Sequence, residues 1–196
     1  TIGKPFVTKR ENIKMKQSSY LENLFLDLPS QANQHSPLSE VHIFLKQKAR
    51  EEIIKLFPKE SNQQAIDFKP FGELIFPYHK MGTIDSLNLF EWDELIIFSF
   101  YWKNKKFYKN TLDVGANLGL HSIIMAKCGF NVQSYEPDPT HFNILTDNID
   151  LNQCSAVKPN NAAASTQSGE MEFTRVLGNT TGSHLSGAKT NPYGEL

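Results

Sequence analysis

The chain has 196 residues, and 39% of them are hydrophobic, which is enough for one sizeable core with an accessory segment. The formal net charge of −1 gives no reason to expect a nucleic acid or an anionic membrane surface as a partner. Cys128 and Cys154 are too few for a disulfide scaffold, and the apolar runs are too short for a signal peptide or a membrane span. We therefore expect a soluble cytoplasmic protein.

Residues 1–60 are expected to form a helical N-terminal extension, and residues 61–196 the main domain. Helical stretches are expected at residues 19–27 and 39–57, separated by a linker at residues 29–37 that is rich in Ser, Gln and Asn. In the longer helix the apolar residues are expected to form one stripe: Val41, Phe44, Leu45, Ile53, Ile54 and Leu56.

Between the N-terminal helices and the predicted sheet, the sequence predicts a strand or hairpin, a turn and a helix. Residues 71–78 predict a short strand or hairpin, and residues 82–87 a turn. Residues 91–103 predict a helix that is apolar on nearly all sides, so we expect it to be buried against the sheet.

A glycine turn is the most informative feature of the sequence. Residues 111–114 predict a short buried strand that carries Asp113, and Gly115 and Gly119 supply backbone that turns sharply before a helix at residues 118–127. The N-terminal NH groups of this helix favour an anion such as a carboxylate. The glycines are four residues apart with Asn117 between them, which differs from the G-x-G-x-x-G pattern that seats a pyrophosphate.

A second strand, residues 131–135, ends at Glu136, which lies 23 positions after Asp113. That is where an acid accepts hydrogen bonds from a ribose diol. Together the two strand ends favour an adenosyl site. Pro137 fixes the exit from the strand, and Asp138 or Pro139 is expected to flank the adenine.

Three stretches in linked order resemble the FkbM-type S-adenosylmethionine-dependent methyltransferases: TLDVGANLGLHS at residues 111–122, YEPDPTHFNILTDNIDLN at 135–152, and NAAAS followed by SGEMEF within 161–173. The resemblance implies a class I methyltransferase fold, α/β with a Rossmann-like parallel sheet. It also implies S-adenosylmethionine as cofactor and methyl transfer to a hydroxyl of a sugar or natural product, so a small molecule or glycan is the expected acceptor. Sequence pattern and resemblance together give these cofactor-binding residues: Asp113, Gly115, Asn117, Gly119, His121, Ser122, Glu136, Pro137, Asp138, Asn161 and Ala162.

Two of these residues carry alternative interpretations. His121 lies in the first turn of a helix, where a positive imidazole is disfavoured, so it is a weak candidate for a neutral general base and otherwise structural. Ser122 either binds the methionine carboxylate of the cofactor or caps the helix. The remaining histidines share no metal-ligand spacing, so no metal is expected.

The C-terminal part continues the alternation with a helix at residues 140–151 and strands at 156–160 and 171–176, which predicts a parallel sheet. Residues 178–196 are rich in small residues and are expected to form loops. With about three parallel strands, the strand that carries Asp113 would lie at an edge, so we expect a C-terminal half of the domain to be missing from this sequence. Two other functions stay open: a non-catalytic adenosyl-binding or assembly module, and an NAD-dependent dehydrogenase, which the glycine spacing disfavours.

Overall fold

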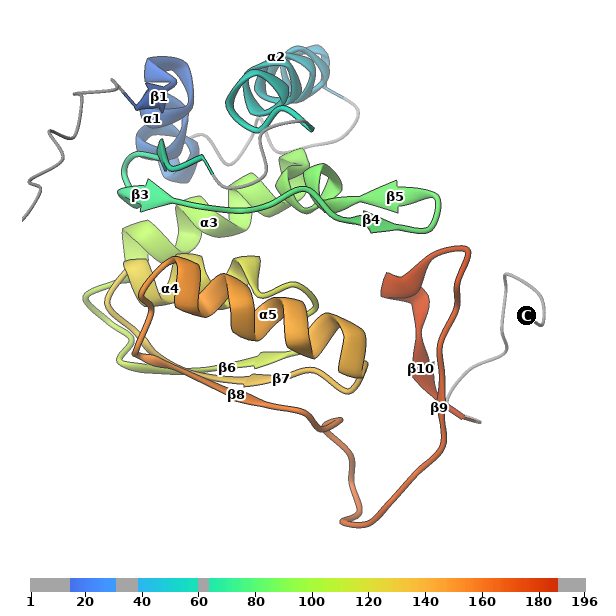
Figure 1. The fold of residues 1–196 in the computed structure, drawn as a ribbon. Coiled ribbons are helices and arrows are strands. Elements are labelled where there is room, and N and C mark those ends of the chain that lie inside the picture. The colour runs from blue at the N-terminus through green and yellow to red at the C-terminus, as the bar shows by residue number, and fades with distance from the viewer. Residues whose placement is uncertain (1–14, 31–38, 60–63, 187–196) are drawn as a thin grey trace, which may run out of the picture.

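The computed structural model describes residues 15–30, 39–59 and 64–186. It is a mixed α/β structure around a parallel three-stranded sheet in the order β6 (Asn110–Val114), β7 (Asn131–Tyr135) and β8 (Val157–Asn160). Helix α4 (Leu120–Lys127) connects the first two strands and α5 (Pro139–Leu151) connects the last two. Both helices cover the same face of the sheet (Figure 1). The predicted helix–strand alternation is confirmed for this part of the chain.

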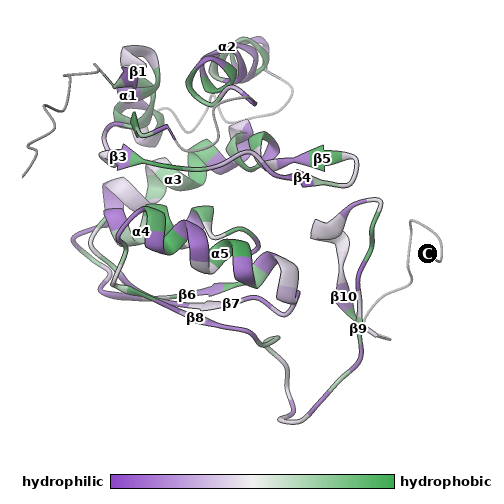
Figure 2. Cartoon of the chain, in the orientation of Figure 1, coloured by the Kyte–Doolittle hydropathy of each residue, from purple (hydrophilic) through white to green (hydrophobic). Residues whose placement is uncertain are grey.

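A helical layer lies over α4 on the side away from the sheet. Its centre is α3 (Trp92–Asn104), which packs against α4 and also against α1 (Ser19–Asp27) and α2 (Glu40–Leu56) (Figure 1). Figure 2 shows hydrophobic stretches on α3 and α5, the helices at the centre of the molecule. The buried apolar side chains form one continuous cluster that reaches from α1 to β8.

Phenylalanines make up much of the core in the helical layer. Phe25 meets Phe71 edge to face with ring centroids 5.0 Å apart, and Phe57 stacks on Phe90 at 4.5 Å. Phe71 in turn contacts Phe98 on α3 at 6.4 Å. Aromatic pairs of this kind contribute about 0.5–1.5 kcal/mol each beyond the area that they bury. We call the set the aromatic cluster: Phe25, Phe57, Phe68, Phe71, Phe90 and Phe98.

Short elements join these layers. β1 (Lys16–Gln17), β2 (Ile66–Asp67) and β3 (Glu73–Leu74) form a small mixed sheet, and β4 (Lys80–Met81) and β5 (Ile84–Asp85) form a hairpin. Within the described ranges, the 3-10 helices are η1 (Leu28–Ser30), η3 (Ser86–Phe90) and η4 (Thr180–Gly182).

After β8 the chain leaves the sheet and then turns back toward it. We call the returning segment, residues 173–186, the strap. Within it β9 (Phe173–Thr174) pairs antiparallel with β10 (His184–Leu185). The strap is joined to the β4–β5 hairpin, because Thr83 N donates to Gly178 O at 2.8 Å and Gly82 forms a β-bridge with Asn179. The strand predicted at residues 171–176 is thus shorter than expected and does not join the parallel sheet. Of the loop predicted at 178–196, residues 187–196 lie outside the described part.

The helix boundaries predicted near the N-terminus are confirmed, but two predicted burial patterns are wrong. Helix α2 begins after Ser39, whose hydroxyl accepts from His42 N at 3.1 Å, yet Val41, Phe44 and Ile54 are exposed. The helix instead packs through a face that includes His42, whose Nδ1 accepts a hydrogen bond from Trp92 Nε1 at 3.0 Å. On α3, Ile97 and Phe100 are exposed, so the helix is buried on one side only.

Strand β6 lies at an edge of the sheet, as predicted, but the expectation that it is buried is wrong. Leu112 and Val114, which alternate with less exposed residues along the strand, are 68% and 60% exposed. Helices α4 and α5 lie on one face of the sheet, and within residues 15–30, 39–59 and 64–186 no helix or strand covers the other (Figure 1). Over the same residues, no helix combines the length and apolarity that a membrane crossing requires.

Candidate functional site

The carboxyl ends of the three parallel strands lie side by side. Val114 is in register with Tyr135, and Tyr135 with Asn160, so the chain leaves all three strands at one edge of the sheet. This edge gathers the residues that directly follow the strands: Gly115, Glu136 and Asn161.

The turn after β6 has a left-handed backbone at alternate residues. The φ angles of Gly115, Asn117 and Gly119 are +76°, +51° and +86°. A Cβ on Gly119 would lie 3.2 Å from the side chain of Leu145 on α5, so both backbone conformation and packing favour glycine there. The NH groups of Gly115 and Ala116 donate to Tyr135 O at 2.9 and 3.0 Å, which ties the turn to β7.

Glu136 connects the turns that follow β6 and β7. Its side chain is buried, and its carboxylate accepts from Asn117 N at 2.7 Å and from Asp138 N at 2.8 Å. Burial raises the pKa of Glu136, and the neighbouring charges of Asp138 and Asp113 add to this, while the two backbone donors oppose it. The carboxylate therefore holds both turns in place at the strand ends.

Asp113, at the end of β6, is held by a buried pair of serines. Ser122 Oγ donates to Asp113 Oδ2 at 2.5 Å and lies 2.6 Å from Ser134 Oγ. Because the single Ser122 proton goes to the carboxylate, the Ser134 hydroxyl is the donor of the second bond. Ser122 itself is fully buried, and its side chain does not cap α4.

His121 lies between two other side chains. Its Nε2 is 2.9 Å from Glu94 Oε2, and its Nδ1 is 3.1 Å from the Tyr101 hydroxyl. A carboxylate only accepts, so we assign the Nε2 proton to the bond with Glu94; in the neutral ring Nδ1 then accepts from Tyr101. Burial raises the pKa of Tyr101 to about 12, so its hydroxyl keeps its proton. Both ring nitrogens are used, which does not favour His121 as the general base.

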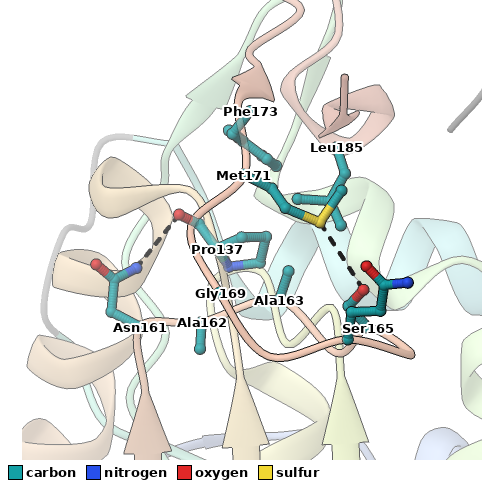
Figure 3. A pocket seen from close by; sticks show the side chains of 10 residues that line it. Pro137, Asn161, Ala162, Ala163, Ser165, Gly169, Met171, Phe173 and Leu185 are labelled. Carbon is teal, nitrogen blue, oxygen red and sulfur yellow. Dashed lines mark hydrogen bonds between the residues drawn. The ribbon is translucent and has the colours of Figure 1, made fainter. Parts of the chain in front are cut away.

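Asp138 and Asn161 stabilise the ends of the other two strands. Asp138 is buried, caps α5 by accepting from Thr140 N at 2.8 Å, and pairs with Arg175 Nε of the strap at 2.6 Å. Burial alone would raise the pKa of Asp138, but Arg175 and Thr140 N outweigh it and the pKa is lowered. Asn161 Nδ2 donates to Glu136 O at 2.8 Å and points toward the backbone of Pro137 (Figure 3).

Three adjoining cavities run along this edge of the sheet. The acidic pocket, about 340 Å³, contains Glu94, Asp113 and His121. The central pocket, about 140 Å³, contains Glu136. The outer pocket, about 270 Å³, is lined by apolar side chains such as Met171 and by polar ones such as Asn161 and Ser165 (Figure 3). Neighbouring pockets share lining residues: Gly115, Asn117 and Thr181 for the first two, Pro137 and Phe173 for the last two. We call the three together the groove.

The groove brings together eight of the eleven predicted residues: Asp113, Gly115, Asn117, His121, Glu136, Pro137, Asn161 and Ala162. The other three, Gly119, Ser122 and Asp138, lie behind it and hold the turns and the strap. Sequence reasoning missed Glu94 and Thr181. The only sequence feature that could have indicated a role for Glu94 is an acidic residue in the first turn of an apolar helix. Nothing in the sequence indicates that the strap brings Thr181 to the acidic pocket.

Over the described residues, no three His, Cys, Asp or Glu side chains lie together as metal ligands do. No family model and no curated protein matches the chain. Among solved structures, it is similar to an S-adenosylmethionine-dependent methyltransferase from Agrobacterium tumefaciens, at 9% identity and a TM-score of 0.39. The match covers 52% of this chain and 32% of the other, so the chain spans about a third of that protein's length. A likeness of this size does not by itself assign an activity.

Proposed function

We propose that the groove binds S-adenosylmethionine and that the protein is an S-adenosylmethionine-dependent methyltransferase. The observation that carries this proposal is the order of the three pockets. A carboxylate at the end of β7, Glu136, lies between an acidic pocket at the end of β6 and an uncharged pocket beyond β8 that offers both apolar and polar side chains. The cofactor has the same order of chemistry, with a cationic methionyl end, a ribose diol and a flat adenine.

The side chains of each pocket fit the matching part of the cofactor. Each Glu136 oxygen accepts one backbone NH and keeps a second lone pair, so the carboxylate can still accept from ribose hydroxyls. The rings of Pro137 and Phe173 in the outer pocket offer apolar faces for adenine. The first turn of α4 has no side-chain cap, so its NH groups suit the methionine carboxylate.

An unsatisfied acceptor in the groove supports the same ligand. Asn117 Oδ1 is buried and has no hydrogen-bond partner within the described residues. Asn117 lines both the acidic and the central pocket, where the cofactor would present an ammonium group and ribose hydroxyls. Either donor would satisfy this oxygen, which otherwise costs roughly 1–3 kcal/mol of desolvation.

When bound, the cofactor supplies a methyl group on a sulfonium that is already a good leaving group. The protein then has to hold the donor, exclude water and align the acceptor. The resemblance to FkbM-type enzymes extends the proposal to transfer onto a hydroxyl of a sugar or natural product. Both His121 nitrogens already form hydrogen bonds. We therefore expect a group other than this ring to take the proton from the hydroxyl that receives the methyl group.

The two alternative functions, an NAD-dependent dehydrogenase and a non-catalytic adenosyl-binding or assembly module, would use the groove differently. A dinucleotide would bring a pyrophosphate dianion to the start of α4, next to the carboxylates of Glu94 and Asp113, which would repel it. The single methionine carboxylate comes with an ammonium group and a sulfonium, which the same two side chains attract. A non-catalytic adenosyl-binding module would use the same groove without turnover. Conversion of bound S-adenosylmethionine to S-adenosylhomocysteine in the presence of hydroxyl acceptors therefore separates an enzyme from such a module.

Isothermal titration calorimetry on the purified chain tests the binding step. S-adenosylmethionine and S-adenosylhomocysteine should bind, and NAD⁺ should not. A chain that binds NAD⁺ more tightly than either adenosyl ligand would contradict the proposal.

Substitution of Glu136 tests the assignment of the central pocket. Glu136→Ala should weaken S-adenosylmethionine binding about tenfold or more, since charge-assisted hydrogen bonds to two hydroxyls are lost. It also leaves Asn117 N and Asp138 N without an acceptor, so we expect the melting temperature to fall. Glu136→Gln keeps one of these bonds and should be more stable but still weak in binding. The control is Glu73→Ala at an exposed carboxylate of β3, and equal affinities for all variants would reject the assignment.

A further inference from the structure

The acidic pocket has an unusual charge balance for a cavity at a helix N-terminus. Two carboxylates, Glu94 from α3 and Asp113 from β6, face it, and the residues that line it in the described part of the chain include no lysine or arginine. The other polar groups that face it are neutral amides and a hydroxyl, apart from His121. Since partial shielding from water strengthens electrostatic interactions, this pocket favours a cation.

Glu94 is held in a fixed position rather than left mobile. His121 Nε2 donates to one of its oxygens at 2.9 Å, and His121 is itself bound by Tyr101 at 3.1 Å. The imidazole also packs edge to face against Phe98, with ring centroids 5.0 Å apart. The second oxygen, Oε1, accepts no hydrogen bond from any residue that the structure describes.

A separate observation indicates that this pocket takes a ligand with hydrogen-bond donors. The buried Oδ1 of Asn117 has no partner among the described residues, and Asn117 lies at the junction of the acidic and central pockets. A cationic nitrogen satisfies such an oxygen and at the same time neutralises a carboxylate. Nearby, the open first turn of α4 accepts an anion. Together these groups suit a zwitterion with an additional positive charge.

We infer that Glu94 recognises the positive charge at the methionyl end of the cofactor, with His121 and Tyr101 as the residues that position it. This inference rests on the proposed function and adds to it a specificity-determining residue from α3, outside the glycine turn and the strand ends. His121 acts through Glu94 and is a positioning residue. The hydrogen bonds from Tyr101 to His121 and from His121 to Glu94 thus connect the helical layer to the groove.

Three ligands that share one adenosyl group test the inference in Glu94→Gln. S-adenosylmethionine carries a sulfonium and an ammonium, S-adenosylhomocysteine only the ammonium, and 5′-methylthioadenosine neither charge. By calorimetry we expect Glu94→Gln to bind the first about tenfold more weakly and the third unchanged. The affinity of the variant for S-adenosylmethionine should also depend less on salt than that of the unchanged chain, because one charge attraction is gone.

Asp93→Asn, at an exposed acid in the same helical turn, is the matched control and should bind all three ligands as the unchanged chain does. His121→Phe keeps the ring packing but loses both hydrogen bonds, so it should show the same selective loss as Glu94→Gln. His121→Gln keeps a donor for Glu94 and should restore much of the selectivity.

Equal weakening of all three ligands in Glu94→Gln, or unchanged binding of S-adenosylmethionine, would overturn the inference and leave the proposed function standing. An unchanged chain that binds none of the three ligands would overturn the proposed function and this inference together.

Discussion

At the scale of single residues, His141 shows how burial sets the ionisation of a group beside the groove. The ring lies in the central pocket and is buried, with Nε2 2.9 Å from Thr180 Oγ1 of the strap. Burial lowers the pKa of His141, and the charges of Arg175 and His79 lower it further against the opposing effect of Asp138. Burial lowers the pKa of His79 as well. In the folded chain both rings resist protonation.

This predicts that the free energy of unfolding falls as the pH drops below about 6.5, the ordinary value for histidine. There the unfolded chain binds protons that the folded chain does not, so stability is lost with a slope of up to about 1.4 kcal/mol per pH unit for each such ring. Urea unfolding between pH 7.5 and 5.5 measures it. His141→Gln should flatten the slope, whereas Thr180→Val, which removes only the hydrogen bond, should lower the whole curve without changing its slope. Parallel curves for the unchanged chain and His141→Gln would contradict this account.

The residues at the strand ends could be predicted because they depend on local pattern. A strand that ends in an acid or a glycine turn places that residue at the edge of a parallel sheet, which is where Asp113, Gly115 and Glu136 lie. Ser122 and Asp138 could not be assigned in this way. Their hydrogen-bond partners, Ser134 and Arg175, follow 12 and 37 positions later, and no spacing rule relates them.

At the scale of elements, the strap closes one side of the groove and is attached at two places. Arg175 and Thr180 bind it to α5, and Gly178 and Asn179 bind it to the β4–β5 hairpin. In the attachment to the hairpin, Gly82 is in close contact with the backbone of Gly178. Its φ is +87°, and a Cβ there would overlap the carbonyl group of Gly178.

Gly82→Ala should therefore detach the strap from the hairpin. Gly72→Ala is the matched control, because Gly72 has a φ of +86° but nothing within 4 Å of an added Cβ. The control should cost about 1–2 kcal/mol from backbone strain alone, and Gly82→Ala should cost clearly more. Hydrogen exchange at Thr83 N, which donates to Gly178 O, should speed up only in Gly82→Ala. Equal protection of Thr83 N in both variants would mean that the strap tolerates the added methyl group.

Element types were easier to predict from the sequence than packing faces. The apolar periodicity and the serine N-cap locate α2 well, but which side of it is buried depends on α3. There the Trp92–His42 hydrogen bond draws a polar residue inward and leaves Phe44 outside. The pairing of β9 was also unpredictable, because two residues carry too little pattern to distinguish an isolated hairpin from a further parallel strand.

At the scale of the whole molecule, one face of the parallel sheet and the edge beside it are open in the described part of the chain. No strand among the described residues pairs with the free edge of β6, and Leu112 and Val114 expose apolar side chains beside it. An edge with both properties is a template for pairing with another chain.

We expect this chain to self-associate through β6 and the open face of the sheet. The double variant Leu112→Lys, Val114→Thr should raise the monomer fraction in sedimentation velocity with little change in melting temperature, since both side chains are already exposed. Ile54→Lys, at an exposed apolar position on α2, is the control and should associate as the unchanged chain does. If the α2 variant rather than the sheet variant raises the monomer fraction, the contact lies on the helical layer.

The aromatic cluster also bears on the order in which the molecule folds. All of its members, from Phe25 to Phe98, precede the first residue of β6 in the chain. During synthesis from the N-terminus, this layer can bury its rings before the glycine turn has left the ribosome. Helix α4 would then pack on a surface of α3 that already exists. The parallel strands, whose pairing is slow because it joins distant residues, would assemble beneath α4. Glu94 and Tyr101 would thus be in place before His121 arrives between them.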